Sequence, residues 1–360
     1  MKSLFIKSRD KNYTVFFKND LEFLENLKRQ KGIWVIDQTV HTLYKKYFDA
    51  INTDSVILLA TSEEQKTIEG AVRLYRGLIA KNMKRTRPLI SVGGGVTQDV
   101  TGFVASTLYR GLRWIYVPTT LLAQADSCIG SKTSLNFDTS KNLIGTFYAP
   151  DEVYISSAFL KTLRPLEFYS GFGEIVKLQL MRARQPKGLR LIADRLNLNK
   201  HPDTLIELIY DSLLIKKRYI EKDEFDTGER RLLNYGHCFG HALESASKFS
   251  IPHGLAVVMG MLFANIIAVK RQRITGEGFD AIVKSIFFPH LHADLLDMRK
   301  EWLNSEALFQ NMQKDKKRTG TGIALVLPRQ HDLGLEVVQD LSREEFEYGC
   351  EELKKIINFE

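Results

Sequence analysis

The sequence predicts two domains, an α/β domain followed by a mainly helical one. Short apolar runs rich in β-branched residues alternate with helix-length segments up to about residue 157, whereas helical periodicity dominates afterwards. Continuous apolar strands separated by helices are typical of a parallel sheet that is covered on both faces. We therefore expect a nucleotide-type α/β domain over residues 1–157 and a helical domain over residues 158–360.

Each predicted element follows from a short pattern. Strands are expected at IWVID (33–37), SVILLA (55–60), PLISV (88–92) and WIYVP (114–118). Helices are expected over 165–184, 203–222, 230–249 and 253–273, where apolar residues recur at helical spacing.

The longest apolar run, from Leu255 to Val269, is broken by Gly260 and Asn265. It is shorter than the roughly 20 apolar residues that a membrane span needs. We expect a buried helix there and no membrane partner.

Composition narrows the function classes. The chain has 360 residues, of which 44% are hydrophobic and 26% charged, as in an ordinary globular protein. Its 51 basic and 43 acidic residues give a net charge of +8, which favours an anionic partner. Its three cysteines are too few and too scattered for a disulfide framework, so we expect a reducing, cytoplasmic location. No segment shows the basic and aromatic pattern of a nucleic-acid-binding surface.

A glycine-rich turn, GGGVTQDVTGF (93–103), follows the strand at 88–92 and leads into a helix. Backbone without side chains can approach a pyrophosphate there, and helix N–H groups can face it. A turn of this kind without a ligand remains the alternative.

Residues 118–150 combine glycines with Asp126, Lys132, Lys141 and Asn142. Such donors and tight turns are used for anion recognition, although a plain surface loop can contain the same residue types.

His237 and His241 stand four residues apart and share one face of a helix, and His253 follows twelve residues after His241. Neutral imidazoles gathered in this way suit zinc, and Glu174, one turn before Lys177, is a candidate acidic ligand. The spacing alone makes both His237 and His241 ligands, while a purely structural role for a helical histidine stays open. Together the patterns suggest redox chemistry on a phosphorylated polyol.

Eight motifs in this order resemble those of the 3-dehydroquinate synthases, within the sugar phosphate cyclases. They extend from about residue 62 to 317 and read GGGVTQD, ASTLYRG, PTTLLAQADSCIGSKT, KNLIG, SGFGEIVK, RRLLNYGHCFGHA, HGLAV and KDKK. The resemblance implies a Rossmann-like NAD-binding domain, then a helical metal-binding domain, with the site in the cleft between them. It also implies a homodimer.

The resemblance implies roles for individual residues. The metal, zinc or else cobalt or iron, would be held by Glu174, His237 and His253, and His241 would face the substrate phosphate instead. NAD would be held by Glu63, Lys66, Gly93, Gly94, Gly95, Asp99, Thr119, Thr120 and Lys141. Asp126 and Lys177 would contact the reacting hydroxyls, Lys132, Asn142, His241 and Lys316 the phosphate, and Arg110 the site of a neighbouring subunit.

The activity implied is the conversion of 3-deoxy-D-arabino-heptulosonate 7-phosphate to 3-dehydroquinate and phosphate in the shikimate pathway. It comprises transient NAD-dependent oxidation, β-elimination of phosphate, reduction and an intramolecular aldol closure. Lys216, Arg230 and Asn234 match the family's carboxylate-binding positions, and a substrate without a carboxylate would leave two cations unpaired.

Three residues depart from the family pattern. Gln98 and Ser131 replace glycines and could crowd the cofactor and phosphate turns, and Leu255 replaces a glutamate beside the metal site.

Other sugar phosphate cyclases, of the valiolone, deoxyinosose or aminodehydroquinate type, therefore remain alternatives. A metal-dependent polyol dehydrogenase, a non-catalytic paralogue and a basic nucleic-acid-binding protein are more distant ones.

Overall fold

The computed structural model describes residues 2–138, 140–182, 186–198, 204–292, 296, 299–313, 323–329 and 334–357. The chain forms two compact units: residues 1–164 with 220–225, and residues 165–219 with 226–360. We call Ile220–Phe225 the crossing segment, because it belongs to the first unit although its neighbours in sequence belong to the second. Lys316 and the rest of the basic loop 314–322 lie outside the described residues.

The first unit is built on a seven-stranded sheet in the order β1-β2-β9-β6-β5-β3-β4. Every neighbouring pair is parallel except β1 and β2. The four strands predicted from apolar runs are confirmed as β3, β4, β5 and β6. The strands are β1 (Ser3–Ile6), β2 (Tyr13–Lys18), β3 (Ile33–Asp37), β4 (Val56–Leu59), β5 (Leu89–Gly93), β6 (Trp114–Pro118) and β9 (Glu152–Ser156).

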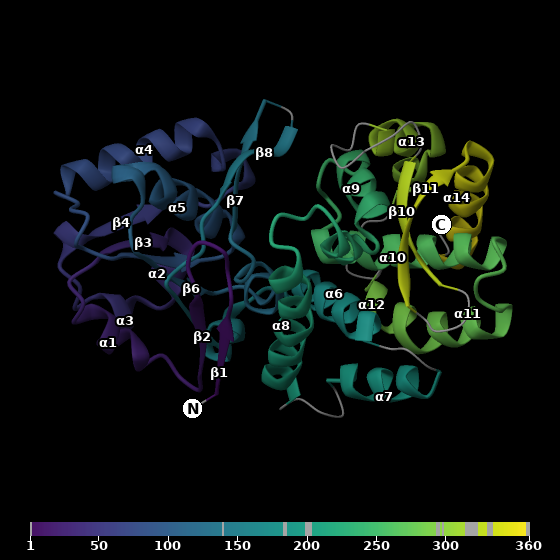
Figure 1. The fold of residues 1–360 in the computed structure, drawn as a ribbon, viewed down its shortest axis with the longest axis horizontal. Helices are drawn as coiled ribbons and strands as arrows, with labels where there is room; N and C mark the ends of the chain where they lie inside the picture. The colour runs from purple at the N-terminus through teal and green to yellow at the C-terminus, as the bar shows by residue number, and fades with distance from the viewer. Residues whose placement is uncertain are drawn as a thin grey trace. The chain divides into compact units, whose positions relative to one another are not determined.

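Helices cover both faces of this sheet (Figure 1). They are α1 (Phe23–Lys28), α2 (Gln38–Leu43), α3 (Lys45–Phe48), α4 (Ile68–Ala80) and α5 (Gly95–Thr107). In Figure 1, α4 and α5 lie on one face and α1 and α3 on the other.

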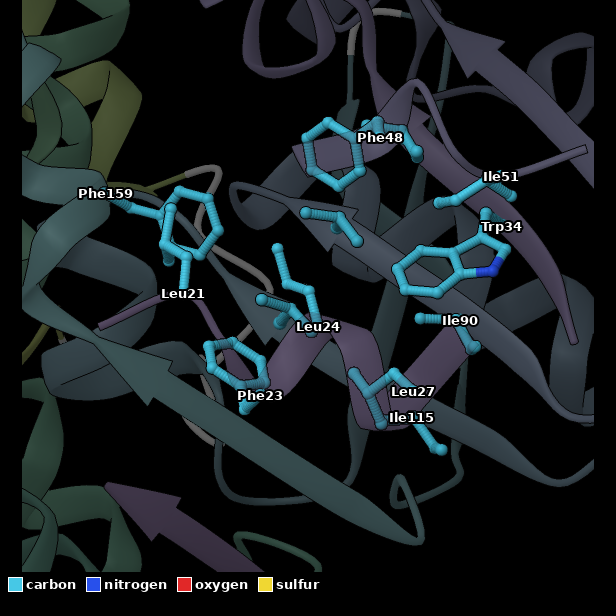
Figure 2. Packing of buried hydrophobic residues seen from close by; sticks show 13 residues of the cluster. Leu21, Phe23, Leu24, Leu27, Trp34, Phe48, Ile51, Ile90, Ile115 and Phe159 are labelled. Carbon is cyan, nitrogen blue, oxygen red and sulfur yellow. The ribbon is translucent and has the colours of Figure 1, made fainter. Parts of the chain in front are cut away.

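The α1 and α3 face has its own apolar core. Figure 2 shows Leu24, Leu27 and Phe48 packed against Trp34 and Ile90 of the sheet. The fully buried strands β3, β5 and β6 are therefore held between two helical layers, as continuous apolar strands require.

Residues 118–150 contain regular structure rather than a plain loop. A π-helical turn, Ala123–Ser127, follows β6. An antiparallel hairpin comes next, formed by β7 (Lys132–Phe137) and β8 (Ser140–Phe147). Several polar residues of the predicted site thus lie on a hairpin beside the main sheet.

The second unit is mainly helical and is organised around α10 (His253–Lys270), in which every residue from Gly254 to Ala268 is buried. This helix is long and apolar enough to cross a membrane, but 83% of the apolar window is buried inside the structure. The expectation of a buried core helix is confirmed.

Three helices that matter for the site are α6 (Pro165–Arg182), α8 (Leu205–Lys222) and α9 (His237–Ala246). A 3-10 helix, Glu229–Asn234, precedes α9. The other helices are α7 (Pro186–Leu196), α11 (Gly276–Ile282), α12 (Phe288–Leu291), α13 (Ser305–Gln313) and α14 (Arg343–Ile357).

A hairpin of β10 (Ile323–Pro328) and β11 (Leu335–Leu341) also belongs to the second unit. The sequence reading placed no strand here, although the apolar run IALVLP is a strand-like pattern.

Candidate active site

Three side chains from three helices of the second unit converge at one point. The Nε2 atoms of His237 and His253 lie 3.4 and 3.3 Å from Glu174 Oε1. The carboxylate belongs to α6, while the two imidazoles stand at the first positions of α9 and α10. Glu174 is fully buried, and neither of its oxygens accepts a well-formed hydrogen bond within the described residues.

These separations fit a shared metal ion. Two ligand atoms about 2.1 Å from one tetrahedral cation are about 3.4 Å apart. The observed spacing of 3.3 and 3.4 Å therefore leaves the room that a cation needs between carboxylate and imidazoles. A buried carboxylate also needs positive charge close to it, which Lys177 supplies and a metal ion would add to.

The second ring nitrogen of each histidine is engaged elsewhere. Nδ1 of His237 lies 3.2 Å from the carbonyl oxygen of Tyr235, and Nδ1 of His253 lies 3.1 Å from Glu244 Oε2. Donation of Nδ1–H to these oxygens leaves both Nε2 lone pairs facing Glu174, the tautomer that a metal ligand requires.

Charge inside the cluster holds Glu174 ionised. Burial favours its neutral form, but the ammonium group of Lys177 and the ring of His253 outweigh burial and hold its pKa at about 2. Lys177 is 2% exposed and makes an ion pair with Glu174. A buried cation is thus fixed beside the predicted metal ligands.

The position of His237 depends on two residues that interrupt the apolar run of α10. A Cβ atom on Gly260 would lie 1.9 Å from the carbonyl oxygen of Gly236, so only glycine allows this contact. Asn265 donates to the Tyr235 hydroxyl at 2.5 Å. Both interruptions therefore support the turn in front of His237.

His241 is not part of the Glu174 cluster. It gathers instead with Glu244 and His253, and the ligand atoms of these three lie within 4.8 Å of one another. That group shares His253 with the first one, and its Glu244–His253 separation of 3.1 Å is a hydrogen-bond distance. Spacing alone paired His237 with His241, whereas the structure joins His237 to Glu174 and His253.

Lys216, Arg230 and Asn234 come from neighbouring parts of the second unit. Leu178, Ile215 and Leu233, each adjacent in sequence to one predicted site residue, pack in one cluster. This cluster ties α6, α8 and the 3-10 helix Glu229–Asn234 together. Lys216 and Arg230 are only 7% and 5% exposed, so two cations are buried in this region.

In the first unit, the glycine-rich turn lies beside Thr119 and Thr120 at the carboxyl ends of β5 and β6. Thr119 N donates to Gly93 O at 3.0 Å, and a Cβ on Gly94 would lie 2.9 Å from the methyl carbon of Thr120. Around Gly95 the space is open, and no side chain caps the start of α5. Parallel sheets bind ligands at such an edge.

A polar network joins several residues predicted to hold the cofactor. Lys66 Nζ lies 2.5 Å from Asp99 Oδ2 and 2.5 Å from Asn142 Oδ1. Burial raises the pKa of Asp99, an effect that Lys66 partly offsets. Through Asn136, which bonds to both, Asn142 is linked to Glu63, and Lys141 Nζ lies 3.7 Å from Glu63.

The structure thus places Asn142 among the predicted cofactor residues. Asp126 lies on the π-helical turn, Lys132 begins β7, and exposed Arg110 ends the 3-10 turn Leu108–Arg110. These residues belong to the first unit, whereas Lys177 and His241 belong to the second.

The sequence reading missed Glu244, Tyr235 and Asn265 near the metal cluster. Glu244 stands three residues after His241 and seven after His237, so helical spacing already places all three on one face of α9. Ser134 and Asn136 of β7, which bond to Asp99 and Glu63, were also missed. Their partners are distant in sequence and no local pattern indicates them.

Two family profiles match adjoining parts of the chain, from residue 56 to residue 318. The 3-dehydroquinate synthase N-terminal profile matches residues 56–170, and the 3-dehydroquinate synthase C-terminal profile matches residues 171–318. The chain belongs to the 3-dehydroquinate synthase family. A 3-dehydroquinate synthase of Dictyoglomus thermophilum is 35% identical over 352 residues, which cover 96% of each chain.

Solved structures share the fold. A 2-epi-5-epi-valiolone synthase from Streptomyces hygroscopicus subsp. jinggangensis 5008, with NAD+ and Zn2+ bound, aligns with a TM-score of 0.83 at 22% identity over 97% of this chain and 98% of that one. A 2-deoxy-scyllo-inosose synthase complexed with carbaglucose-6-phosphate, NAD+ and Co2+ aligns with a TM-score of 0.81 at 24% identity over 98% and 100%. The predicted fold class is confirmed.

Proposed function

We propose that this chain is a 3-dehydroquinate synthase, which converts 3-deoxy-D-arabino-heptulosonate 7-phosphate to 3-dehydroquinate and phosphate. The observation that carries the proposal is the convergence of Glu174, His237 and His253 at 3.3 to 3.4 Å in a member of this family. Zinc or cobalt fits these carboxylate and imidazole ligands.

NAD is the second cofactor, and the first unit has the residues to hold it. The open start of α5 offers backbone N–H groups to a pyrophosphate. The proposed contacts are Glu63, Lys66, Gly93, Gly94, Gly95, Asp99, Thr119, Thr120 and Lys141. When bound, NAD accepts and returns a hydride and the metal polarises a substrate oxygen.

The chain's own residues bind and orient the substrate. Lys177, buried beside Glu174, is placed to exchange a proton with a hydroxyl held at the metal cluster. Asp126 is proposed to contact the same part of the substrate. Lys132, Asn142, His241 and Lys316 are proposed to bind the phosphate, whose negative charge matches the two lysine side chains.

The far end of the substrate decides between members of the superfamily. Lys216 and Arg230 are almost fully buried, and cationic side chains form charge-assisted hydrogen bonds with carboxylates. We assign them, with Asn234, to the carboxylate of the heptulosonic acid. Sugar phosphates such as sedoheptulose 7-phosphate have no carboxylate at this end.

The remaining proposals concern assembly and location. Arg110 is exposed at the surface of the first unit, which supports its donation to a second subunit in a homodimer. The three cysteines Cys128, Cys238 and Cys350 form no disulfide in the described structure, as suits the reducing cytoplasm. We propose that the first domain, about residues 1–157, binds NAD and that residues 158–360 bind the metal and substrate.

A phosphate-release panel tests the proposed activity. The purified protein is supplied with NAD and zinc, and then with the heptulosonic acid phosphate, sedoheptulose 7-phosphate or glucose 6-phosphate. Release from the acid alone is expected, with no net NADH formed. Release only from a sugar phosphate that has no carboxylate would identify a cyclase of the valiolone or deoxyinosose type. Steady NADH formation from a polyol would identify a dehydrogenase.

A further inference from the structure

Gln98 and Ser127 exchange two hydrogen bonds. Gln98 Nε2 donates to the carbonyl oxygen of Ser127 at 2.7 Å, and Ser127 Oγ donates to Gln98 Oε1 at 2.7 Å. Gln98 belongs to α5 and is 7% exposed, and Ser127 is the last residue of the π-helical turn. The amide group of Gln98 therefore both donates a hydrogen bond to Ser127 and accepts one from it, which fixes the π-helical turn against α5.

A second side chain holds the next turn of the same stretch. Ser131 Oγ donates to Glu224 Oε1 at 2.9 Å. Glu224 lies in the crossing segment and also accepts from Ser8 Oγ at 2.6 Å and from Arg9 N at 2.7 Å. The carboxylate thus ties Ser131 to the connection between β1 and β2 in the first unit.

Ser131 has a φ of 58°, in the left-handed region that favours glycine. A serine there is held at a conformational cost, which the hydrogen bond to Glu224 offsets. Gln98 and Ser131 are two of the three departures from the family pattern. Neither side chain is loose in a cofactor or phosphate turn, because each is buried and hydrogen-bonded.

The anchored residues Ser127 and Ser131 lie one position inside the two ends of the stretch 126–132, and the end residues are proposed substrate contacts. Asp126 directly precedes Ser127, and Lys132 directly follows Ser131. Reacting groups must be held to a fraction of an ångström, and groups on a turn depend on their supports for this.

We infer that Gln98 and Glu224 are positioning residues, which hold Asp126 and Lys132 in place through Ser127 and Ser131. The inference rests on the proposed function for the roles of Asp126 and Lys132. Gln98 and Ser131 stand where the family pattern has glycines, so the support that their side chains give to the active site is not part of that pattern.

Full-length variants test the Gln98 anchor. Gln98→Met keeps the side-chain length and removes both hydrogen bonds, so we expect kcat to fall about tenfold, with the melting temperature lowered by only a few degrees. Ser127→Ala removes only the bond from the hydroxyl group and leaves the one to the Ser127 carbonyl oxygen, so its effect should be smaller. The double variant should be no worse than Gln98→Met, because that change already removes both bonds. Ser127→Thr, which keeps the hydroxyl group, should restore most of the activity.

Ser131→Gly tests the second anchor. Glycine suits the backbone at this position, so the turn should persist while the contact with Glu224 is lost. We expect a rise of about tenfold in KM for the phosphorylated substrate with a smaller change in kcat. Glu221→Gln is the matched control, because Glu221 lies in the same segment but accepts from Lys7 N and not from Ser131.

Amide hydrogen exchange over residues 123–132 gives a readout that needs no activity. We expect faster exchange in Gln98→Met and Ser131→Gly, and wild-type exchange in Glu221→Gln. An active wild type whose variants keep its kcat, KM and exchange rates would overturn the inference. Absence of wild-type activity on every phosphate ester would contradict the proposed function instead, and the exchange rates alone would then decide whether the two anchors hold this stretch.

Discussion

Gly173 and Gly254 meet backbone to backbone where α6 packs on α10. A Cβ atom on Gly173 would lie 2.2 Å from the carbonyl oxygen of Gly254. Each glycine is adjacent in sequence to a predicted metal ligand: Gly173 directly precedes Glu174, and Gly254 directly follows His253. The close approach of the two helices is what brings Glu174 within 3.3 Å of His253.

Gly254→Ala should therefore damage both the fold and the metal cluster. The added methyl group would lie 1.7 Å from the Ser170 carbonyl oxygen, so the helices must separate. We expect a loss of about 1 to 3 kcal/mol in unfolding free energy and a drop in bound metal, measured by thermal melts and elemental analysis. Gly276→Ala is the control, since nothing lies within 4 Å of its Cβ position, and it should melt at or above the wild-type temperature.

Replacing His237 and His241 separately should distinguish a ligand from its neighbour. His237→Ala removes an imidazole from the Glu174 cluster, so most bound metal should be lost. His241→Ala should keep the metal and lose phosphate-dependent activity. Equal metal loss in both variants, measured by elemental analysis after dialysis, would restore the reading from spacing alone.

Glu244 should control metal affinity without being a ligand of the Glu174 cluster. Its carboxylate faces Nδ1 of His253 at 3.1 Å and so fixes the tautomer and orientation of the ring. Glu244→Gln, whose amide can face Nδ1 with either its oxygen or its nitrogen, should weaken metal binding about 10- to 100-fold in a competition titration with a chelator. Glu25→Gln, on the surface of the first unit, should leave the affinity unchanged.

Arg230→Ala should raise KM for the carboxylated substrate about 10- to 100-fold, because a charge-assisted hydrogen bond contributes about 1.5 to 3 kcal/mol. Steady-state kinetics measure this value. An unchanged KM would remove Arg230 from the carboxylate site, and any slow turnover of sedoheptulose 7-phosphate should be insensitive to the change.

The junction of α10, β11 and α14 predicts a pH-dependent contribution to stability. Arg271 donates from Nε and Nη2 to the two carboxylate oxygens of Glu345, each at 2.7 Å. Glu345 also accepts a hydrogen bond from Ser342 N at 3.0 Å. Hydrogen bonds from Arg271, opposed by partial burial and aided by Ser342, lower the pKa of Glu345 from 4.5 to about 2. A lowered carboxyl pKa stabilises the fold above pH 4.5, and this stabilisation is lost as the pH falls toward 2.

Glu345→Gln should accordingly lower the unfolding free energy by about 1 to 2 kcal/mol at neutral pH. The difference from wild type should shrink below pH 4.5 in denaturation experiments at stepped pH. Glu347→Gln, which breaks an exposed pair with Arg343, should have a smaller effect. A difference that persists at pH 2 would contradict the electrostatic explanation.

Local patterns predicted the elements that bury one continuous apolar run. The strands β3 and β6 and the helix α10 are of this kind, because nearly all of their consecutive residues are apolar and buried. The hairpin of β10 and β11 is not predicted, because we find no hairpin-turn pattern in the sequence between the two strands.

The candidate site shows the same limit. Residue types identified Glu174, His237 and His253, but helical spacing favoured His241 over Glu174 as the partner of His237. The grouping seen in the structure depends on how α6 and α9 pack on α10, through contacts between residues about 80 positions apart in the case of Gly173 and Gly254. Asn142 also differs from the expectation of a phosphate contact, because long-range contacts place it beside Lys66, a predicted cofactor residue.

The crossing segment has a consequence for protein engineering. Glu221, Glu224 and Phe225 contact Lys7, Ser131 and Phe147, so the amino-terminal half needs six residues that are encoded far downstream. A fragment truncated after residue 164 would leave those contacts empty. A chimera that joins halves from two relatives at the profile boundary would fold well only if the transplanted half carries a matching stretch at 220–225.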